Sequence, residues 1–575
     1  MDLSKSAGEN WTRWSDDLND NEINTSEWLY DLQPGESWGQ WIILNMDPIY
    51  GYVKPGNYIA STTNPDIFLE IEESTGLTNI VNDLGESTFT ILNSITPEGF
   101  ILRLNVRNDG TEPTDLTDLQ IVHEDQVVLV ESGEIFDPQF LEDLSHLAVV
   151  RTMDWGAVNN SKITDVSQLP TESSRTWCNA DQITPYSVQG KLADKLNSDL
   201  WLCVPQGTDS GGVSSFDSAT NQITATGDIP WEENDGIYFY GDWWDLPEPF
   251  EYGTKYYIKD LVGNSFKLSL TPGGAALTIP VSVTEDIGCS ITRIIDHAQL
   301  YADIAQQVYD SGYRGKIYVE WANEVWNFGF DAFQFAQCVM GPEFAGQYDA
   351  GLGYAHGATM AWQAFESRFG RENIIRVACG QSGWFALLSS FFDYVGPDGS
   401  VYEGQEMKDI IDTWAVAPYV SPGTVDDVFA NGGETWTNAQ WTAALEDNID
   451  LVASNIADHI SQLHSIAPGV PVTTYECGNH FARIGGDMMT QQELNMQNNW
   501  INFLDSDDGA AAYQYYYQKV FVENNLTLFN HFVAAGGWSS ERSNYFAQWG
   551  LKPYHAPYES ARWDWFKTLP KTNQE

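Results

Sequence analysis

The stretch Ile-Tyr-Val-Glu-Trp-Ala-Asn-Glu-Val-Trp-Asn (317–327) and the stretch Val-Thr-Thr-Tyr-Glu-Cys-Gly-Asn-His (472–480) decide the fold expected of this chain. Each opens with β-branched and aromatic residues, which indicate a buried strand, and each strand stops at a glutamate, Glu324 or Glu476. Strands of this kind are typical of parallel sheets, whose functional groups gather at the carboxyl ends. We therefore expect both carboxyls at one end of a parallel barrel.

Helix and strand patterns alternate around these two strands, over residues 133–205 and again over 292–575. A (β/α)8 barrel typically takes ~250 residues, so the two ranges can form one with long loops. One strand is missing from the series, because the polar lead-in 1–27 offers no candidate for the first. The seven expected strands are Leu147–Met153, Leu200–Val204, Ile317–Glu324, Ile374–Gly380, Thr413–Tyr419, Val472–Glu476 and Leu528–Ala535.

Two further segments have no helical period. Residues 28–132 contain short strand patterns separated by turns such as Pro34-Gly35 and Asp109-Gly110, which predict a β-sandwich. Residues 206–291 are rich in Gly, Thr and Asp and contain four more strand patterns, which predict a small inserted β-module. The expected fold class is therefore α/β: a (β/α)8 TIM barrel with an N-terminal β-sandwich and a small inserted β-domain.

The amino-acid composition argues against certain classes of binding partner. The chain has 27 Lys and Arg against 81 Asp and Glu, a formal charge of −54, and such a surface repels nucleic acid and anionic membranes. No apolar run reaches the ~18 residues of a membrane span, and no signal-peptide core is visible at the N-terminus. The 6 cysteines form no CxxC pair, which argues against a zinc ribbon or thioredoxin chemistry, and we expect buried apolar packing for Cys203, Cys379 and Cys477. The hydrolytic mechanism expected below implies no metal or organic cofactor.

Two carboxyls at one barrel mouth are what glycoside hydrolysis requires, one as acid/base and one as nucleophile. Asn323 precedes Glu324 and can reach a sugar hydroxyl, whereas for Glu320 we expect a barrel-interior acid paired with a cation. Strand alternation places Glu320, Ala322 and Glu324 on one face. The alternative is that these acids are only surface or salt-bridged groups, but a buried strand cannot end in an unpaired carboxylate cheaply.

These residues carry a resemblance. Trp-Ala-Asn-Glu-Val-Trp-Asn resembles the Asn-Glu strand-four motif of the retaining glycoside hydrolases of clan A, and Tyr-Glu-Cys-Gly-Asn-His resembles their strand-seven nucleophile segment. The resemblance extends to uncharacterised glycosidase-like proteins of environmental bacteria that carry a β-sandwich before strand two. The insert resembles a β-module of phage virion proteins. Further matching segments are Val150–Trp155 with Asn159 and Asn160, Gly380-Gln381, Ala417–Tyr419, Trp538 and Trp549–Leu551.

The resemblance implies that Glu324 is the general acid/base and Glu476 the nucleophile. It implies that Asn323 binds the sugar 2-hydroxyl, and that Arg151 and Tyr419 keep Glu476 ionised by lowering its pKa. Glu324 needs the opposite, a raised pKa. Trp538 would stack on the reacting sugar. The other expected substrate contacts are Trp155, Gln381 and His480, with Trp326 and Trp384 at the rim. An equal alternative is a place in the hydrophobic core for Trp155, Trp326, Trp384 and His480.

We therefore expect a retaining glycoside hydrolase that cleaves a polysaccharide by double displacement, outside the cell or on a virion. The alternative from another class is a virion or cell-surface structural or attachment protein with a glycosidase-like barrel, which would form a higher or homo-oligomeric assembly. The absence of a visible signal peptide and the phage-like insert favour the alternative, and the acid pair with its cation favours the enzyme. A phage depolymerase would satisfy both.

Overall fold

The computed structural model describes most of the chain, and the account that follows is of these residues. They are 12–13, 28–44, 54–72, 76–92, 100–174, 177, 183–227, 229, 231–241, 246–283, 289–395, 402, 404–482, 490–535, 549–552 and 560–571.

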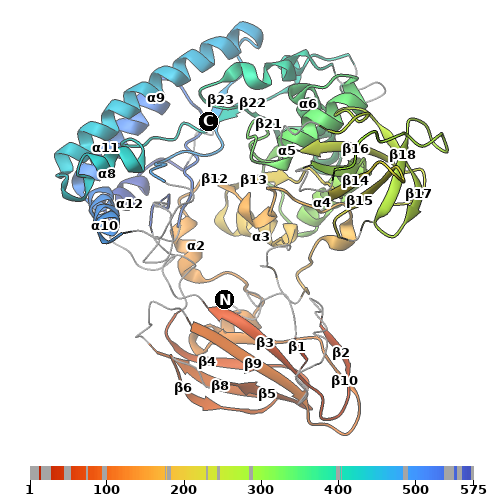
Figure 1. Cartoon of the computed structure of the whole chain (residues 1–575). Coiled ribbons are helices and arrows are strands. Elements are labelled where there is room, and N and C mark those ends of the chain that lie inside the picture. The colour runs from red at the N-terminus through yellow and green to blue at the C-terminus, as the bar shows by residue number, and fades with distance from the viewer. Residues whose placement is uncertain are drawn as a thin grey trace.

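A parallel sheet forms the centre of the larger body (Figure 1). Its strands lie in the order β12-β13-β20-β21-β22-β23, and each is fully or largely buried, as the apolar runs predict. Helix α6 packs against β20 and β21, and α3 packs against β13. The strand bounds are β12 Val149–Arg151, β13 Asp199–Val204, β20 Ile317–Trp321, β21 Ile374–Cys379, β22 Thr413–Val416 and β23 Val472–Thr474.

Helices connect the strands and cover the sheet, and the longest of them in the described ranges, α9, lies beyond β22 and β23 in Figure 1. The helix bounds are α1 Val127–Glu131, α2 Pro138–Leu144, α3 Tyr186–Leu196, α4 His297–Asp310, α5 Asp331–Phe335, the π-helical η5 Ala336–Ala345, α6 Ala350–Phe369, α7 Met407–Ile410, α8 Val425–Ala430, α9 Asn438–Ile466, α10 Gln491–Asp505, α11 Asp507–Tyr516, the π-helical η9 Tyr517–Val522 and α12 Ala561–Phe566.

The sheet is a half-barrel rather than the closed eight-stranded barrel expected from the sequence, because the described residues supply six parallel strands to it. The segment 528–535, predicted as a strand, lies beside β23 without forming a regular ladder. The N–H groups of Thr527 and Phe532 donate to the carbonyls of Val472 and Cys477 at 3.0 and 2.9 Å. Between them, the N–H of Asn530 donates to the hydroxyl of Thr474 (3.0 Å) instead of a carbonyl, and this side-chain bond interrupts the ladder.

The N-terminal part consists of antiparallel sheets below the larger body in Figure 1. One sheet has the order β1-β3-β9-β5-β7, another β11-β4-β8-β6, and β2 pairs with β10. Inward side chains such as Leu69, Phe89 and Leu104 form their common core. The bounds are β1 Thr12–Arg13, β2 Leu29–Leu32, β3 Ser37–Leu44, β4 Gly56–Ser61, β5 Ile67–Ile71, β6 Leu77–Val81, β7 Asp83–Leu84, β8 Glu86–Ile91, β9 Phe100–Asn108, β10 Thr114–Leu116 and β11 Gln120–His123.

The segment between β13 and α4 folds as a closed antiparallel barrel in the order β14-β15-β18-β17-β16-β19. Phe216, Phe239 and Phe266 fill it, whereas Tyr238 and Tyr240 point out of it into the core of the larger body. Lys255 and Tyr238 both bond to Glu343 of η5, so the module is packed onto the segment that follows β20. The bounds are β14 Gly211–Asp217, β15 Gln222–Ala225, β16 Gly236–Gly241, β17 Tyr256–Val262, β18 Ser265–Ser269 and β19 Cys289–Arg293.

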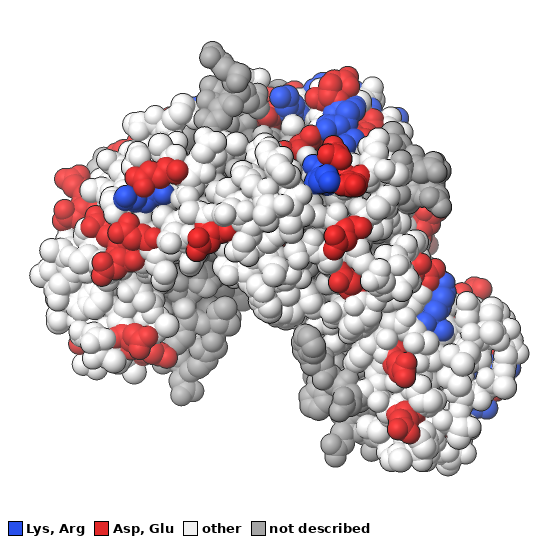
Figure 2. Space-filling view, turned by 90° about the horizontal axis from the view of Figure 1, so that it is seen from above, with Lys and Arg blue, Asp and Glu red and all other residues white. Residues whose placement is uncertain are grey.

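The surface reflects the acidic composition. On the face in Figure 2, Asp and Glu are spread over the molecule and few Lys or Arg accompany them. In the part of the chain that the structure covers, the helices are all too short or too polar to cross a membrane. Cys203, Cys379 and Cys477 are buried as expected, but the expectation of purely apolar packing is wrong for Cys203 and Cys379, whose thiols donate to the buried carboxyl of Glu320. Cys178 lies outside the described residues.

Candidate active site

The backbone changes direction where β20 ends. The strand stops at Trp321, and Ala322 and Glu324 then adopt left-handed conformations with φ of 57° and 45°. For residues with a Cβ this costs roughly 1–2 kcal/mol each, and strain of this kind is concentrated at functional sites. The N–H of Ala322 donates to the carbonyl of Val204 (2.7 Å), which fixes the turn to the neighbouring strand. The alternation expected for Glu320, Ala322 and Glu324 is therefore wrong beyond the end of the strand.

After this turn, the side chains of Asn323 and Glu324 bond to different neighbours. The Asn323 amide nitrogen donates to Oδ1 of Asn159 at 3.0 Å, and its oxygen accepts from Arg151 at 2.8 Å. The Glu324 carboxyl accepts from Tyr475 Oη at 3.0 Å and from Asn327 Nδ2 at 2.8 Å. Both side chains are therefore oriented by neighbouring groups before any substrate binds.

Glu476 follows β23 by two residues and lies at the same end of the sheet as Glu324. Its Oε1 accepts from Nη1 of Arg151 at 2.7 Å, and its Oε2 accepts from Oη of Tyr419 at 2.8 Å. Tyr475 connects the two acids, because its hydroxyl donates to Glu324 while its ring lies 5.3 Å from the Arg151 guanidinium carbon. The structure thus brings Glu324, Glu476, Arg151 and Tyr419 together, as the sequence predicts.

Burial dominates the protonation of both acids. It raises the pKa of Glu476 to about 7, with a further rise from the Glu324 charge, although Arg151 and Tyr419 lower it. The expectation that Arg151 and Tyr419 bring this pKa below its ordinary value is therefore wrong, since removal of the carboxylate from water outweighs both contacts. Burial also raises the pKa of Glu324, as expected of an acid/base, while Asn327 and Tyr475 lower it.

The remaining expected substrate residues are distributed around this centre. His480 lies edge-on to Tyr419, with ring centroids 5.2 Å apart, and burial lowers its pKa. Gln381 follows β21, and its buried Oε1 has no hydrogen-bond partner within the described ranges. Trp384, three residues further, is 55% exposed and free to stack on a sugar. Trp538 lies outside the described residues.

Two other tryptophans have structural contacts. Trp326 is half-buried and donates from Nε1 to the Tyr475 hydroxyl at 3.0 Å, so it supports the acid pair. Trp155 is half-buried and stacks on Phe140, with centroids 6.1 Å apart. Trp155 nevertheless lines the cavity described next, so both of its expected roles remain compatible with its position.

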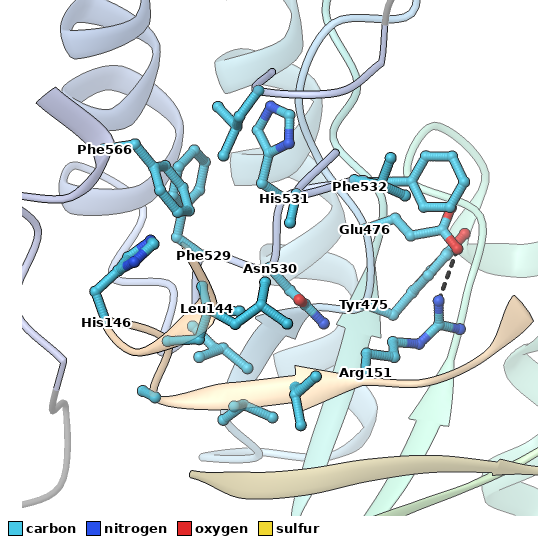
Figure 3. Close-up of a pocket in the computed structure, with 18 of the residues that line it drawn as sticks. Leu144, His146, Arg151, Tyr475, Glu476, Phe529, Asn530, His531, Phe532 and Phe566 are labelled. Atoms are coloured by element: carbon cyan, nitrogen blue, oxygen red, sulfur yellow. Dashed lines mark hydrogen bonds and ion pairs between the residues drawn. The ribbon is translucent and has the colours of Figure 1, made fainter. Parts of the chain in front are cut away.

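A cavity of about 310 Å³ adjoins Glu476 and continues along β12 (Figure 3). Figure 3 shows the Arg151–Glu476 ion pair at one end of the cavity and His146 with Phe566 at the other. Its walls come from β12 and from residues 526–535, which lie beside β23. The cavity therefore occupies the gap in the half-barrel between its first strand and the segment after its last.

Several contributing residues were not expected from the sequence. Tyr475 was missed because strand alternation places it opposite Glu476, whereas β23 ends before either residue. Asn327 holds Glu324 but lies in a loop where no period applies. The motif itself could have indicated Asn327, because it closes the quoted stretch 317–327. In the described part of the chain, no group of three or more His, Cys, Asp or Glu side chains is arranged to hold a metal ion.

Comparison with known proteins gives little further guidance. No family model and no curated protein matches the chain. Among solved structures, a GH26-CBM35 β-(1,4)-mannanase of Podospora anserina aligns at 8% identity and a TM-score of 0.22, covering 83% of this chain and 86% of its own. The N-terminal endo-1,4-β-D-xylanase 10B of Clostridium thermocellum, with CBM22-1 and GH10 modules, aligns at 8% and 0.25, covering 83% and 88%. Similarity this distant carries no argument about activity.

Proposed function

We propose that this protein is a retaining glycoside hydrolase that acts on a polysaccharide. The observation that carries the proposal is the convergence of Glu324 and Glu476, from the ends of β20 and β23, on one network with Arg151 and Tyr475. Arg151 is already ion-paired with Glu320 and Glu476, so its charge does not require Glu324. Glu324 is held instead by Tyr475 and Asn327, and two carboxyls in different surroundings are the pairing that acid/base and nucleophilic roles require.

In the first step the ionised Glu476 attacks the anomeric carbon, while Glu324 gives its proton to the glycosidic oxygen as that bond breaks. The leaving sugar departs as an alcohol, and a glycosyl ester of Glu476 remains. In the second step Glu324, now ionised, takes a proton from water, and the water oxygen attacks the same carbon. Glu476 is released as a carboxylate and the anomeric configuration is retained.

The contacts around each acid fit its role. Arg151 and Tyr419 hold the two oxygens of Glu476, so its rotamer is fixed and its leaving charge is stabilised in the second step. Tyr475 and Asn327 fix Glu324, and burial keeps its pKa above the ordinary value although these two hydrogen bonds lower it. Asn323 is oriented by Asn159 and Arg151, in a position suited to the sugar 2-hydroxyl.

The test is a screen of bacterial and marine polysaccharides, with the products identified by mass spectrometry. The wild type should release oligosaccharides from at least one polymer, and Glu476→Gln should abolish release, because the amide cannot act as the carboxylate nucleophile that forms the glycosyl ester. Glu366→Gln is the matched control, since Glu366 is also ion-paired to an arginine, Arg376, but outside the site. Full activity of Glu476→Gln would refute the assignment.

The second candidate is a cell-surface or virion attachment protein that binds glycan without cleaving it. The observation that favours it is the closed antiparallel module, which is packed against η5 and whose described residues make none of the hydrogen bonds given above for the acid pair. Glycan binding without release of product by the wild type, together with a defined higher assembly in size-exclusion chromatography, would support this candidate. On either account we place the protein outside the cell or on a virion.

A further inference from the structure

A third carboxylate, Glu320, lies inside the half-barrel behind the two site acids. It is fully buried, and donors surround it on both oxygens. Its Oε2 accepts from Arg151 Nε and Nη2 at 3.2 and 2.9 Å and from Trp201 Nε1 at 2.8 Å. The thiols of Cys203 and Cys379 complete the set, donating to Oε2 and Oε1, each at 3.1 Å.

The two thiols are donors rather than a redox pair. Burial raises the pKa of both, so each sulfur keeps its proton. Cys203 and Cys379 lie on β13 and β21, on opposite sides of β20, which puts their Cα atoms about two strand spacings, or ~9–10 Å, apart. A disulfide needs Cα atoms within ~7 Å, so these cysteines cannot form one without moving the sheet. Their thiols instead donate hydrogen bonds to the Glu320 carboxyl, one to each oxygen.

Glu320 changes how the positive charge of Arg151 acts on Glu476. The guanidinium is shared: Nε and Nη2 face Glu320, and Nη1 faces Glu476. Glu476 therefore sees a neutral Arg151–Glu320 pair rather than a free positive charge. Burial is the main cause of the raised pKa of Glu476, and the guanidinium that lowers this pKa is the one that Glu320 shares.

We propose that Glu320 is a positioning residue that offsets the charge of Arg151 at Glu476 and holds the guanidinium between the two carboxylates. In the proposed reaction, on which the catalytic meaning of this inference rests, a nucleophile bound to an uncompensated arginine would be a weaker base and a poorer attacking group. Glu320 also fixes the guanidinium plane, so that Nη1 points to Glu476 and Nη2 to Asn323. It acts through Arg151 and does not touch the substrate.

Other ionisable groups lie on the elements around Glu476, and of these Arg151, Glu324 and Tyr419 shift its pKa. Those from the packed elements are Arg151 and Asp154 around β12, Cys203 on β13, Glu320 and Glu324 around β20, Tyr419 after β22, and Tyr475, Cys477, His480 and His531 around and after β23. The thiols and tyrosines stay neutral because burial raises their pKa values. The expected effect of Glu320 therefore comes from its own charge and that of Arg151.

The test is the titration of Glu476 itself, followed by ¹³C NMR of the full protein with labelled glutamate side chains and assigned by comparison with Glu476→Gln. In Glu320→Gln the midpoint should fall by about 1–3 pH units, the usual effect of an unshared arginine on a carboxyl. Glu366→Gln removes the partner of a different arginine, Arg376, and should leave the midpoint in place. An unchanged or raised midpoint in Glu320→Gln overturns the inference.

A second pair of variants covers the case in which Glu320→Gln does not fold. Arg151→Met should raise the midpoint, because it removes the guanidinium that lowers the pKa of Glu476 and takes away the ion-pair partner of Glu320. Adding Glu320→Gln to this variant should lower the midpoint again, and no change on adding it overturns the inference. These readouts need no substrate, so a shifted titration with no polysaccharide cleaved refutes the proposed function alone. With a substrate, the acid limb of kcat/KM should move with the midpoint.

Discussion

Replacing Glu476 by Gln should make the protein gain stability relative to the wild type as the pH rises. Glu476 is buried, and its pKa is raised from 4.5 to about 7. A group of this kind favours the folded state fully below pH 4.5, where it is protonated in both states, and the advantage is lost as the pH rises through 7. The amide of the Glu476→Gln variant cannot ionise, so the variant escapes this loss.

The magnitude follows from the pKa of about 7 against the ordinary 4.5. At 1.36 kcal/mol for each pH unit, the wild type should lose about 3 kcal/mol relative to the variant between pH 4 and pH 8. The assay is urea unfolding at several pH values, followed by tryptophan fluorescence, because Trp201, Trp414 and Trp441 are fully buried in the larger body. Because the chain has several separate hydrophobic cores, its parts can unfold separately. Only the unfolding transition of the larger body is therefore compared between the two proteins.

Cys477→Ala is the matched control, because it changes the adjacent buried residue without changing charge. Burial raises the pKa of the Cys477 thiol, so it stays neutral over this range and the stability difference should not vary with pH. A difference between wild type and Glu476→Gln that is flat from pH 4 to pH 8 would refute the reasoning. So would one in which the wild type gains, because Glu476 would then be held ionised by Arg151.

The other predictions concern the pH profile and the rim. Tyr419→Phe removes a hydrogen bond that lowers the pKa of Glu476. The acid limb of kcat/KM should therefore move to higher pH, and the rate at pH 6 should fall about 10-fold or more. An acid limb that stays in place contradicts this prediction. Tyr475→Phe removes a hydrogen bond that lowers the pKa of Glu324, so the basic limb of kcat/KM should move to higher pH. If the acid limb alone moves, Glu324 is the nucleophile and Glu476 the acid/base. Trp384 is exposed, and its ring can stack on a sugar. Trp384→Ala should therefore raise KM for a polymer about 10-fold in steady-state kinetics, with kcat unchanged. An unchanged KM would show that Trp384 does not contact the polymer.

The sequence predicted the parallel strands well because buried β-branched runs have few alternative structures. It also predicted that Arg151 and Tyr419 would meet Glu476 and that Glu320 would be paired with a cation, and the hydrogen bonds confirm these contacts. Charged groups buried within one sheet can be satisfied in few ways, and pairing with each other is the most accessible of them.

Other features could not be read from patterns. The left-handed backbone at Ala322 and Glu324 is imposed by tertiary contacts, and it ends the alternation on which the sequence argument relied. The segment 528–535 has strand composition, but the hydroxyl of Thr474 takes one of its backbone N–H groups. The pKa of Glu476 depends on how much water the fold excludes and on the nearby charges of Arg151 and Glu324, and neither is visible in local sequence.

The most direct test of the central claim is to trap the glycosyl ester on Glu476. Glu324→Ala is incubated with a panel of activated 2-fluoro glycosides and digested, and the peptides are sequenced by mass spectrometry. The account predicts one sugar attached to the peptide that contains Tyr475 and Glu476, and its absence from the same peptide of Glu324→Ala/Glu476→Gln. Attachment at another carboxylate, or hydrolysis by the wild type with inversion of the anomeric centre, would contradict it.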